Sequence, residues 1–150
     1  MSPLAPGAAP ASSPEQRRAA HALRAANEVK SLDEPMQKAY RSYVERIGTT
    51  IITNGLGQAL ATELAAAGGG SSEAPQKRAH RQLYVNLQAW LCRDSGVLRG
   101  SGGDRRDADL LDNLVSIPQS DYLRVQAEAL AWLVWHKKLC RAFLPRGNEE

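Results

Sequence analysis

Three groups of positively charged residues are the features of this sequence whose type and spacing most clearly suggest chemistry. In each group the side chains fall within two turns of a predicted helix, so they share a region of its surface. The groups are Lys77, Arg78 and Arg81; Arg17 and Arg24; and Lys137, Lys138 and Arg141. Lysine and arginine can contact phosphate groups without recognising base sequence. The pattern therefore predicts candidate contact sites for a polyanion.

Each group also has an interpretation that needs no ligand. Positive charge at a helix N-terminus opposes the helix dipole, so the group at 77–81 costs roughly a few tenths of a kcal/mol per exposed charge. A phosphate at that end would reverse the penalty, but a solvated helix end remains an alternative. Basic residues at a helix C-terminus complement the dipole, so capping alone would explain the group at 137–141. We rank 77–81 first, Arg17 and Arg24 second, and 137–141 third.

Few side chains could converge on a catalytic centre. Basic neighbours surround the histidines, which predicts solvated or phosphate-facing positions on polar helix faces. The three are His21, His80 and His136. Asp104, Asp107 and Asp109 resemble a metal cluster, but the glycine and terminal glutamate of a calcium loop are missing. With no nucleophile elbow or phosphate-binding loop, the sequence predicts a protein that is not an enzyme and has no cofactor, metal or small-molecule substrate.

The tryptophans and cysteines are expected to have structural roles. Trp90, Trp132 and Trp135 could stack on bases of a single strand, but their positions on apolar stripes predict a place in the core. Cys92 and Cys140 lie far apart in the chain, without a second cysteine or a histidine at metal-ligand spacing. We expect two free thiols in a reducing cytoplasm.

Composition favours one helical domain. The chain has 150 residues with 43% hydrophobic and 23% charged residues, and a net charge of +3. Alanine is abundant and β-branched residues are few, which favours helix over sheet. We expect an all-α fold, a single compact bundle of about six helices at residues 13–144, after a disordered leader at 1–12 and before a loose tail at 145–150. The apolar run at 129–135 is too short to span a bilayer, and no signal peptide is recognisable, so a cytoplasmic protein is expected.

Capping residues and apolar periodicity place the helices. Ser13 with Gln16 forms a predicted capping box, and Asp33 precedes a second helix start. The segment at 129–135 is apolar on all sides, which predicts the central buried helix. The expected helices span about 14–29, 34–47, 49–67, 75–92, 104–116 and 121–143.

Two glycines interrupt the apolar stripe of the expected third helix. The stripe comprises Ile52, Leu56, Ala59, Leu60 and Leu64. Gly55 and Gly57 each cost about 0.5–1 kcal/mol relative to alanine inside a helix. Either a neighbouring helix approaches closely here, or one helix ends at 53–54 and another starts at Gly55. A nucleotide loop is rejected because no strand precedes the glycines and Leu60 stands where a third glycine is needed.

Several segments together resemble a known family. A helix with Tyr40 and Tyr43 is followed by the segment Ile51-Ile52-x-Asn54-Gly55-Leu56-Gly57-Gln58-Ala59-Leu60. Then come Tyr84, Trp90 and Leu91, and finally Tyr122-x-Arg124, Glu128-Ala129-Leu130 and Trp135-x-Lys137-Lys138. Over residues 15–144 this order is similar to the small, all-helical fifth subunit of the type III-B CRISPR RNA-targeting effector, the Cmr complex. Ala61, Cys140 and two long Gly/Ser-rich loops depart from the pattern.

The resemblance implies an accessory subunit in antiviral defence, not a nuclease. Its partners would be other Cmr subunits, copies of itself, and the crRNA and target RNA. Copies would stack along the crRNA-bearing backbone and help to form the channel where target RNA pairs with the guide. The three basic groups would then contact RNA. The alternatives are a free-standing helical DNA-binding regulator, with residues 75–92 as recognition helix, and a scaffold whose basic residues meet only acidic proteins.

Overall fold

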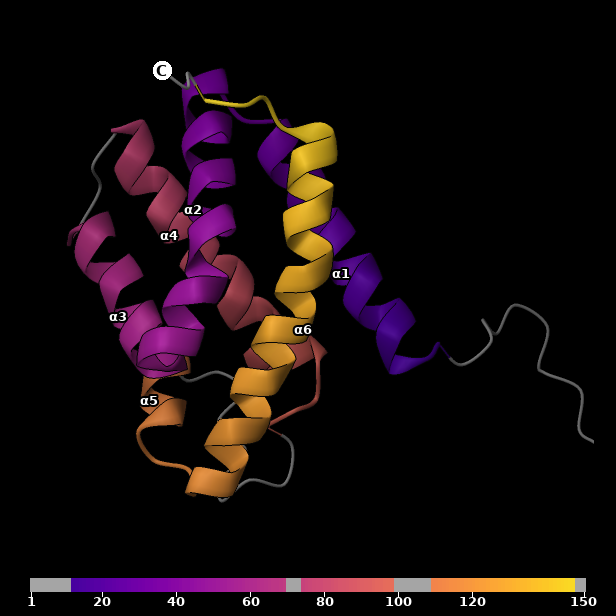
Figure 1. Cartoon of the computed structure of the whole chain (residues 1–150), viewed down its shortest axis with the longest axis vertical. Coiled ribbons are helices and arrows are strands. Elements are labelled where there is room, and N and C mark those ends of the chain that lie inside the picture. Colours follow the sequence, from indigo (N-terminus) through magenta and orange to yellow (C-terminus); the bar gives the residue numbers. More distant parts are fainter. Residues whose placement is uncertain (1–11, 70–73, 99–108, 148–150) are drawn as a thin grey trace, which may run out of the picture.

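The computed structural model describes residues 12–69, 74–98 and 109–147, and within these ranges the secondary structure is helical with no strand (Figure 1). The elements are α1 (Pro14–Lys30), α2 (Glu34–Asn54), α3 (Leu56–Ala67), α4 (Pro75–Ala89), the π-helical segment η1 (Trp90–Asp94), α5 (Leu110–Leu114) and α6 (Gln119–Phe143). The predicted all-α bundle of about six helices is confirmed. The predicted leader lies almost entirely outside the described residues, as do 148–150.

The helix starts follow from local chemistry in the sequence. Ser13 Oγ accepts a hydrogen bond from the Gln16 amide at 3.1 Å, and Gln16 Oε1 accepts one from the Ser13 amide at 2.9 Å. This is the predicted capping box, which satisfies backbone N–H groups that have no partner inside the helix. Asp33 Oδ2 caps α2 in a similar way by accepting from the Met36 amide at 3.3 Å.

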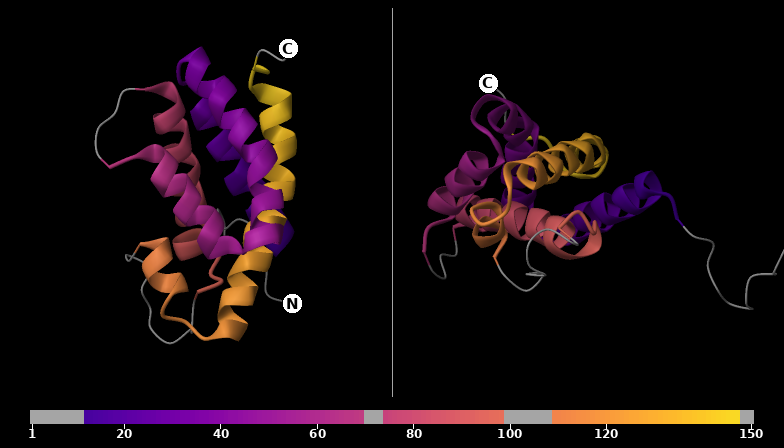
Figure 2. Two further views of the ribbon diagram at one scale, coloured as in Figure 1. Left: turned by 60° about the vertical axis from the view of Figure 1, so that its left-hand side comes forward. Right: turned by 90° about the horizontal axis from the view of Figure 1, so that it is seen from below.

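The bundle is organised around α2. Figure 1 shows α1 and α6 on one side of α2, and α3 and α4 on the other. α5 and the first turns of α6 form the end of the bundle opposite the C-terminus (Figure 2). Trp90 and Trp132 are buried in the core, as predicted, and Trp135 packs partly buried against it. Both cysteines are buried and free.

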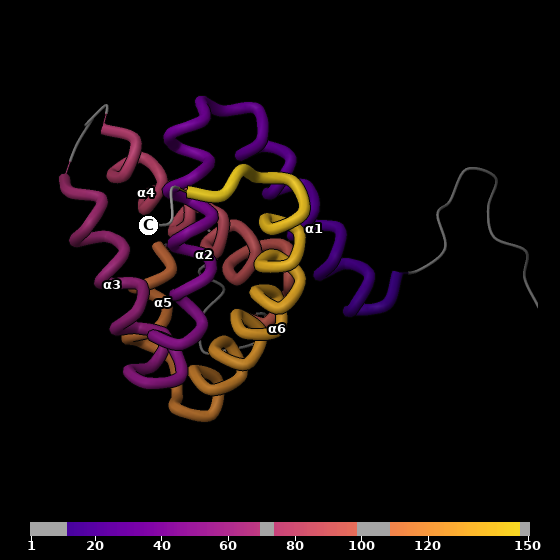
Figure 3. The backbone as a smooth tube through the Cα atoms, turned by 45° about the horizontal axis from the view of Figure 1, so that its top comes forward, coloured from indigo at the N-terminus to yellow at the C-terminus, as the bar shows by residue number. Residues whose placement is uncertain are grey.

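The glycine segment joins two helices instead of interrupting one. α2 continues through Gly48, where the sequence predicted its end, and stops at Asn54. Gly55 has φ +89°, a conformation that costs other residues energy, and the chain turns there into α3 (Figure 3). Gly57 lies within α3 where a Cβ would come 3.2 Å from Tyr122 Oη. Both interpretations of the glycines are therefore correct, one for each residue.

Some expected boundaries were wrong. Ile52 was assigned to an apolar stripe but is 74% exposed, because the stripe of α3 does not extend back across the turn at Gly55. The predicted start of the helix at 104–116 lies outside the described residues, and among those described the helix spans Leu110–Leu114, two residues short of the expected end. The last helix begins at Gln119, two residues before the expected start at 121. No helix in the described ranges is long and apolar enough to cross a membrane.

Candidate nucleic-acid interface

The histidines are not arranged as the sequence predicted. His136 was expected on a polar face but is fully buried. Its Nδ1–H donates to the Ala22 carbonyl at 3.0 Å, and its Nε2 accepts from the Tyr40 hydroxyl at 2.6 Å. Asn86 Nδ2 in turn donates to Tyr40 Oη at 2.8 Å. Burial lowers the pKa of His136 to about 3, so this side chain is a neutral part of the core.

The other two histidines are also held by partners within the fold. His21 is buried, where its Nδ1 accepts from Trp132 Nε1 at 3.0 Å, and burial lowers its pKa. His80 was also expected on a polar face but is only partly exposed, with Nδ1 2.6 Å from Glu63 Oε2 and its ring stacked on Tyr43. The described part of the chain holds no cluster of three or more potential metal ligands. Asp104 and Asp107 lie outside that part.

The first-ranked basic group has partners inside the protein. Arg78 Nη1 lies 3.1 Å from Asp33 Oδ1, the carboxylate that caps α2. Arg81 Nη2 donates to the Ala67 carbonyl at the C-terminal end of α3, at 3.1 Å. Lys77 is exposed and its side chain lies beside Gly68. The carboxylate of Asp33 explains the position of Arg78 without a bound phosphate. Arg81, held by a carbonyl, and Lys77 keep their positive charge near the start of α4.

The second group lies on α1. Arg17 and Arg24 are both exposed. Arg17 borders a shallow cleft between α1 and α6, where Arg18 makes a two-pronged contact with Glu128 at 2.7 and 2.9 Å. Arg18 is therefore neutralised by a partner on α6. Arg17 and Arg24 keep their charges at the surface of the same helix.

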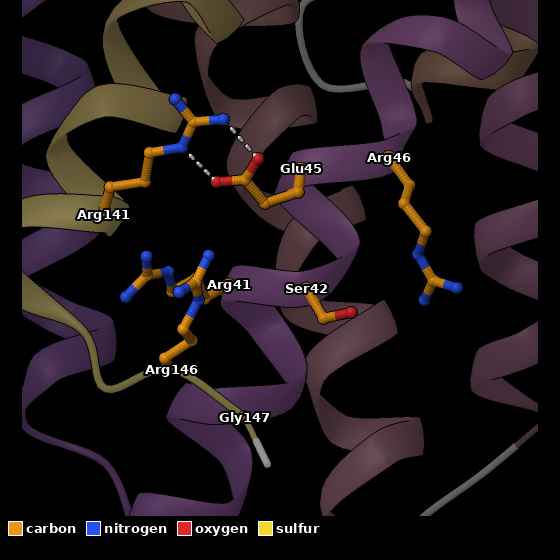
Figure 4. A pocket seen from close by; sticks show the side chains of 7 residues that line it. All are labelled: Arg41, Ser42, Glu45, Arg46, Arg141, Arg146 and Gly147. Carbon is orange, nitrogen blue, oxygen red and sulfur yellow. Dashed lines mark hydrogen bonds and ion pairs between the residues drawn. The ribbon is translucent and has the colours of Figure 1, made fainter. Parts of the chain in front are cut away.

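One residue of the third group, Arg141, is part of a larger basic site that the sequence did not predict. Arg141, near the end of α6, faces α2 across a cleft of about 580 Å³ (Figure 4). We call this the arginine cleft; its lining residues are Arg41, Ser42, Glu45, Arg46, Arg141, Arg146 and Gly147. Lys137 lies 3.9 Å from Glu45 at its edge, and Lys138 is exposed on α6. The third-ranked group is thus the one to which the fold adds most positive charge.

The electrostatics of the arginine cleft are asymmetric. Glu45 is the one carboxylate among the lining residues, and Arg141 Nε and Nη2 donate to its two oxygens at 2.5 and 2.7 Å. This contact lowers the pKa of Glu45. Arg41 Nη1 donates to the Leu144 carbonyl at 2.9 Å, and the Arg46 guanidinium lies 5.3 Å from the centre of the Tyr43 ring. Neither contact neutralises an arginine, so the cleft has excess positive charge.

Two comparisons with known proteins identify the family of this chain. A sequence model of a CRISPR-associated protein family, Cas_Cmr5, matches residues 14–143. The chain belongs to the Cmr5 family. A crystal structure of a CRISPR-associated Cmr5 family protein from Thermus thermophilus has the same fold, with a TM-score of 0.65 at 21% identity, covering 90% of this chain and 100% of that one. The resemblance predicted from the sequence is confirmed.

Membership of the Cmr5 family makes this chain a small structural subunit of the type III-B CRISPR effector, associated with the other Cmr subunits. The match runs from α1 through α6, and it includes all three predicted basic groups as well as Arg41 and Arg46. A free-standing DNA-binding regulator fits poorly, because Asn86 of its proposed recognition helix is buried against Tyr40. Such a helix would have to expose amide side chains to base edges.

Proposed function

We propose that this Cmr5 subunit is non-catalytic and helps to hold target RNA in the effector through phosphate contacts that ignore base sequence. The observation that supports this most directly is the gathering of cations from α2 and α6 around one cleft. Arg17, Arg24, Lys77 and Lys138 would extend the contact surface, because all four are exposed. A subunit that must accept any target needs phosphate contacts and not base readout. Copies of the subunit would stack along the crRNA-bearing backbone.

The weight of the individual residues within this proposal follows from their partners. Lys77, Arg78 and Arg81 remain candidates, but Arg78 and Arg81 would have to exchange contacts with Asp33 and Ala67 for a phosphate. Arg141 lines the arginine cleft and Lys137 lies next to it, 3.9 Å from Glu45, whereas Lys138 is exposed on the same helix outside the lining. We therefore expect the α6 group to contribute more than the α4 group. The affinity of the isolated subunit should be on the order of 10⁻⁴–10⁻⁶ M and should weaken with salt.

The test is charge reversal in the assembled complex. Arg17, Arg24, Lys77 and Lys138 are changed together to Glu, because these exposed side chains lie outside the core and their replacement should leave it intact. We expect normal incorporation of the subunit and weaker target RNA binding, with a shallower dependence on salt. Charge reversal at Arg93, an exposed residue outside the three groups, is the control. Parent-like RNA binding at both low and high salt, in this variant and in one that replaces Arg41 and Arg46, would contradict the proposal.

The absence of catalysis needs a separate measurement. The purified subunit, with or without divalent metal, should leave RNA intact over hours. The sequence offers Asp104, Asp107 and Asp109 as its closest approach to a metal cluster. RNA cleavage that co-purifies with the protein and disappears when these three aspartates are changed to Asn would show that the subunit is an enzyme.

A further inference from the structure

The arginine cleft has one feature that a simple basic surface lacks, an anion of its own placed among the cations. Glu45 lies on α2 between Arg41 and Arg46, and its carboxylate accepts two hydrogen bonds from Arg141 on α6 (Figure 4). We infer that this cleft binds the phosphodiester backbone of RNA, and that Glu45 occupies the place of one phosphate until RNA displaces it. The inference rests on the proposed RNA-contacting function and adds the site and its internal competitor.

The contact between Arg141 and Glu45 has the geometry expected if the Glu45 carboxylate occupies a phosphate site. Two parallel N–H···O bonds from one guanidinium are the geometry in which arginine binds both carboxylates and phosphates. The side chains of Arg141 and Glu45 are 51% and 29% exposed, so water reaches the pair. Exposed ion pairs contribute little to stability. A phosphate that offers Arg141 the same two bonds can therefore replace the carboxylate at small cost.

The neighbouring arginines are held in position without losing their charge. The Leu144 carbonyl anchors the guanidinium of Arg41, and the ring of Tyr43 lies beside that of Arg46. Neither partner is an anion, in contrast to Asp33, which neutralises Arg78 at the start of α4. Positioned cations bind an anion with less loss of side-chain entropy than mobile ones. The cleft therefore holds positioned cations in excess of its one carboxylate, Glu45, and can bind a further anion.

The layout also suits a chain of phosphates better than a single anion. Arg41 and Arg46 are five residues apart on α2, which places their backbones about 7.5 Å apart along the helix axis. Because each residue turns the helix by about 100°, the two side chains leave α2 in directions about 140° apart, so they can reach different phosphates. Ser42 lies between them and can donate a further hydrogen bond. Figure 4 shows the guanidinium groups of Arg41 and Arg141 on one side of Glu45 and that of Arg46 on the opposite side, so the three would contact different parts of an extended anion.

The decisive variant is Glu45→Gln, which removes the negative charge and keeps the shape of the side chain. Using the full chain and a random-sequence single-stranded RNA oligonucleotide, we expect binding about two- to fivefold tighter at low salt, the range that corresponds to an exposed ion pair. The matched control is Glu34→Gln on the same helix, where Glu34 pairs with Lys38 at 3.1 Å. An equal gain in both variants would mean that only net charge matters, and would overturn the inference.

A second pair of substitutions tests whether the gain arises in the cleft. Adding Arg41→Gln and Arg46→Gln to Glu45→Gln should abolish it and make the salt dependence shallower, by about 0.7 in log–log slope for each phosphate that is no longer neutralised. Glutamine at 41 keeps a donor for the Leu144 carbonyl, and urea unfolding of each variant verifies that it is folded. A gain that survives the removal of both arginines would overturn the inference.

Two further outcomes separate this inference from the proposed function and from a protein partner. If Glu45→Gln has no effect on RNA binding while reversal of Arg17, Arg24, Lys77 and Lys138 weakens it, the cleft inference fails and the proposed function stands. If the Arg41→Gln, Arg46→Gln variant cannot enter the complex although its RNA affinity equals that of the parent, the cleft docks an acidic protein surface and the inference is wrong. If no basic variant alters RNA binding, the proposed function itself fails.

Discussion

The helices α2 and α6 present two faces that treat polar groups in opposite ways. On the inner face, Tyr40 and His136 form a buried chain of hydrogen bonds with Asn86. On the outer face, one residue further along each helix, Arg41 and Lys137 belong to a surface with more cations than anions. No buried side-chain nitrogen or oxygen in the described residues lacks a partner. The buried polar groups have hydrogen-bond partners within the fold, whereas the cations of the outer face outnumber its anions.

The difference between the faces follows from the solvent. Burying an unpaired polar group costs about 1–3 kcal/mol in proteins, so the inner face tolerates no mismatch. Water and salt screen charges at the surface, so an excess of arginine there costs little stability. Surface charges that folding does not require are therefore available for contacts with a partner. Substitutions and pH changes that act on one face can test this contrast, beginning with the largest expected effect.

Truncation on the inner face should be severe. His136→Ala leaves the Tyr40 hydroxyl and the Ala22 carbonyl without their partner and opens a cavity beside Trp132. We expect the free energy of unfolding to fall by about 3–5 kcal/mol, measured by urea denaturation. Lys138→Ala, two residues along the same helix at an exposed position, should change it by less than about 0.5 kcal/mol. Similar changes in the free energy of unfolding for the two substitutions would show that the buried contacts of His136 contribute little to stability.

Acid should weaken the inner face before the outer one. Burial lowers the pKa of His136 from 6.5 to about 3, so between these values the unfolded chain binds a proton that the folded chain excludes. The stability from neutral His136 is therefore complete above pH 6.5 and is lost as the pH falls toward 3, at up to about 1.4 kcal/mol per unit. Urea unfolding across this range measures the slope. The slope should be shallower in His136→Ala, although His21, whose pKa is also lowered, retains a part of it.

Equal slopes in the parent and in His136→Ala would contradict the assignment of this pH dependence to His136. The control is the range above pH 6.5, where His136 is neutral in both states and should add no slope.

Substitution on the outer face should affect binding and not folding. Arg46→Gln removes a charge from a side chain at the surface, where its guanidinium lies beside the Tyr43 ring. We expect the free energy of unfolding to change by less than about 0.5 kcal/mol, while affinity for single-stranded RNA falls at low salt. A destabilisation comparable to that of His136→Ala would mean that the two faces do not differ as described.

The contrast between the faces also explains why the sequence-based predictions about the histidines failed. Basic neighbours in sequence suggested that His21 and His136 were solvated, but neighbours in a helix point in different directions. His136 precedes Lys137 and Lys138 and still faces the core. Apolar periodicity placed Trp90 and Trp132 correctly because large apolar residues gain most from burial. A histidine can satisfy either environment, so its position in the sequence did not decide between them.

The sequence alone determined the fold class, most of the helix starts and the family. Capping residues such as Ser13 and Asp33 act over three or four positions, and apolar periodicity is a local property of each helix, so both are visible in the chain. The relative ranking of the three basic groups as contact sites depended on the tertiary structure. Arg78 and Arg81 met partners from outside α4, whereas Arg141 was brought to the arginines of α2.

What only the tertiary structure decided is where unmatched charge accumulates. Arg41 and Arg141 are about a hundred positions apart in sequence, and no local rule relates them. They share a cleft because the apolar faces of α2 and α6 pack together. This packing brings the edge of α2 that carries Arg41 next to the edge of α6 that carries Arg141. Hydrophobic burial fixes the helix pair without regard to surface charge, so the arginine cleft is a consequence of the core that the charge pattern of the sequence did not reveal.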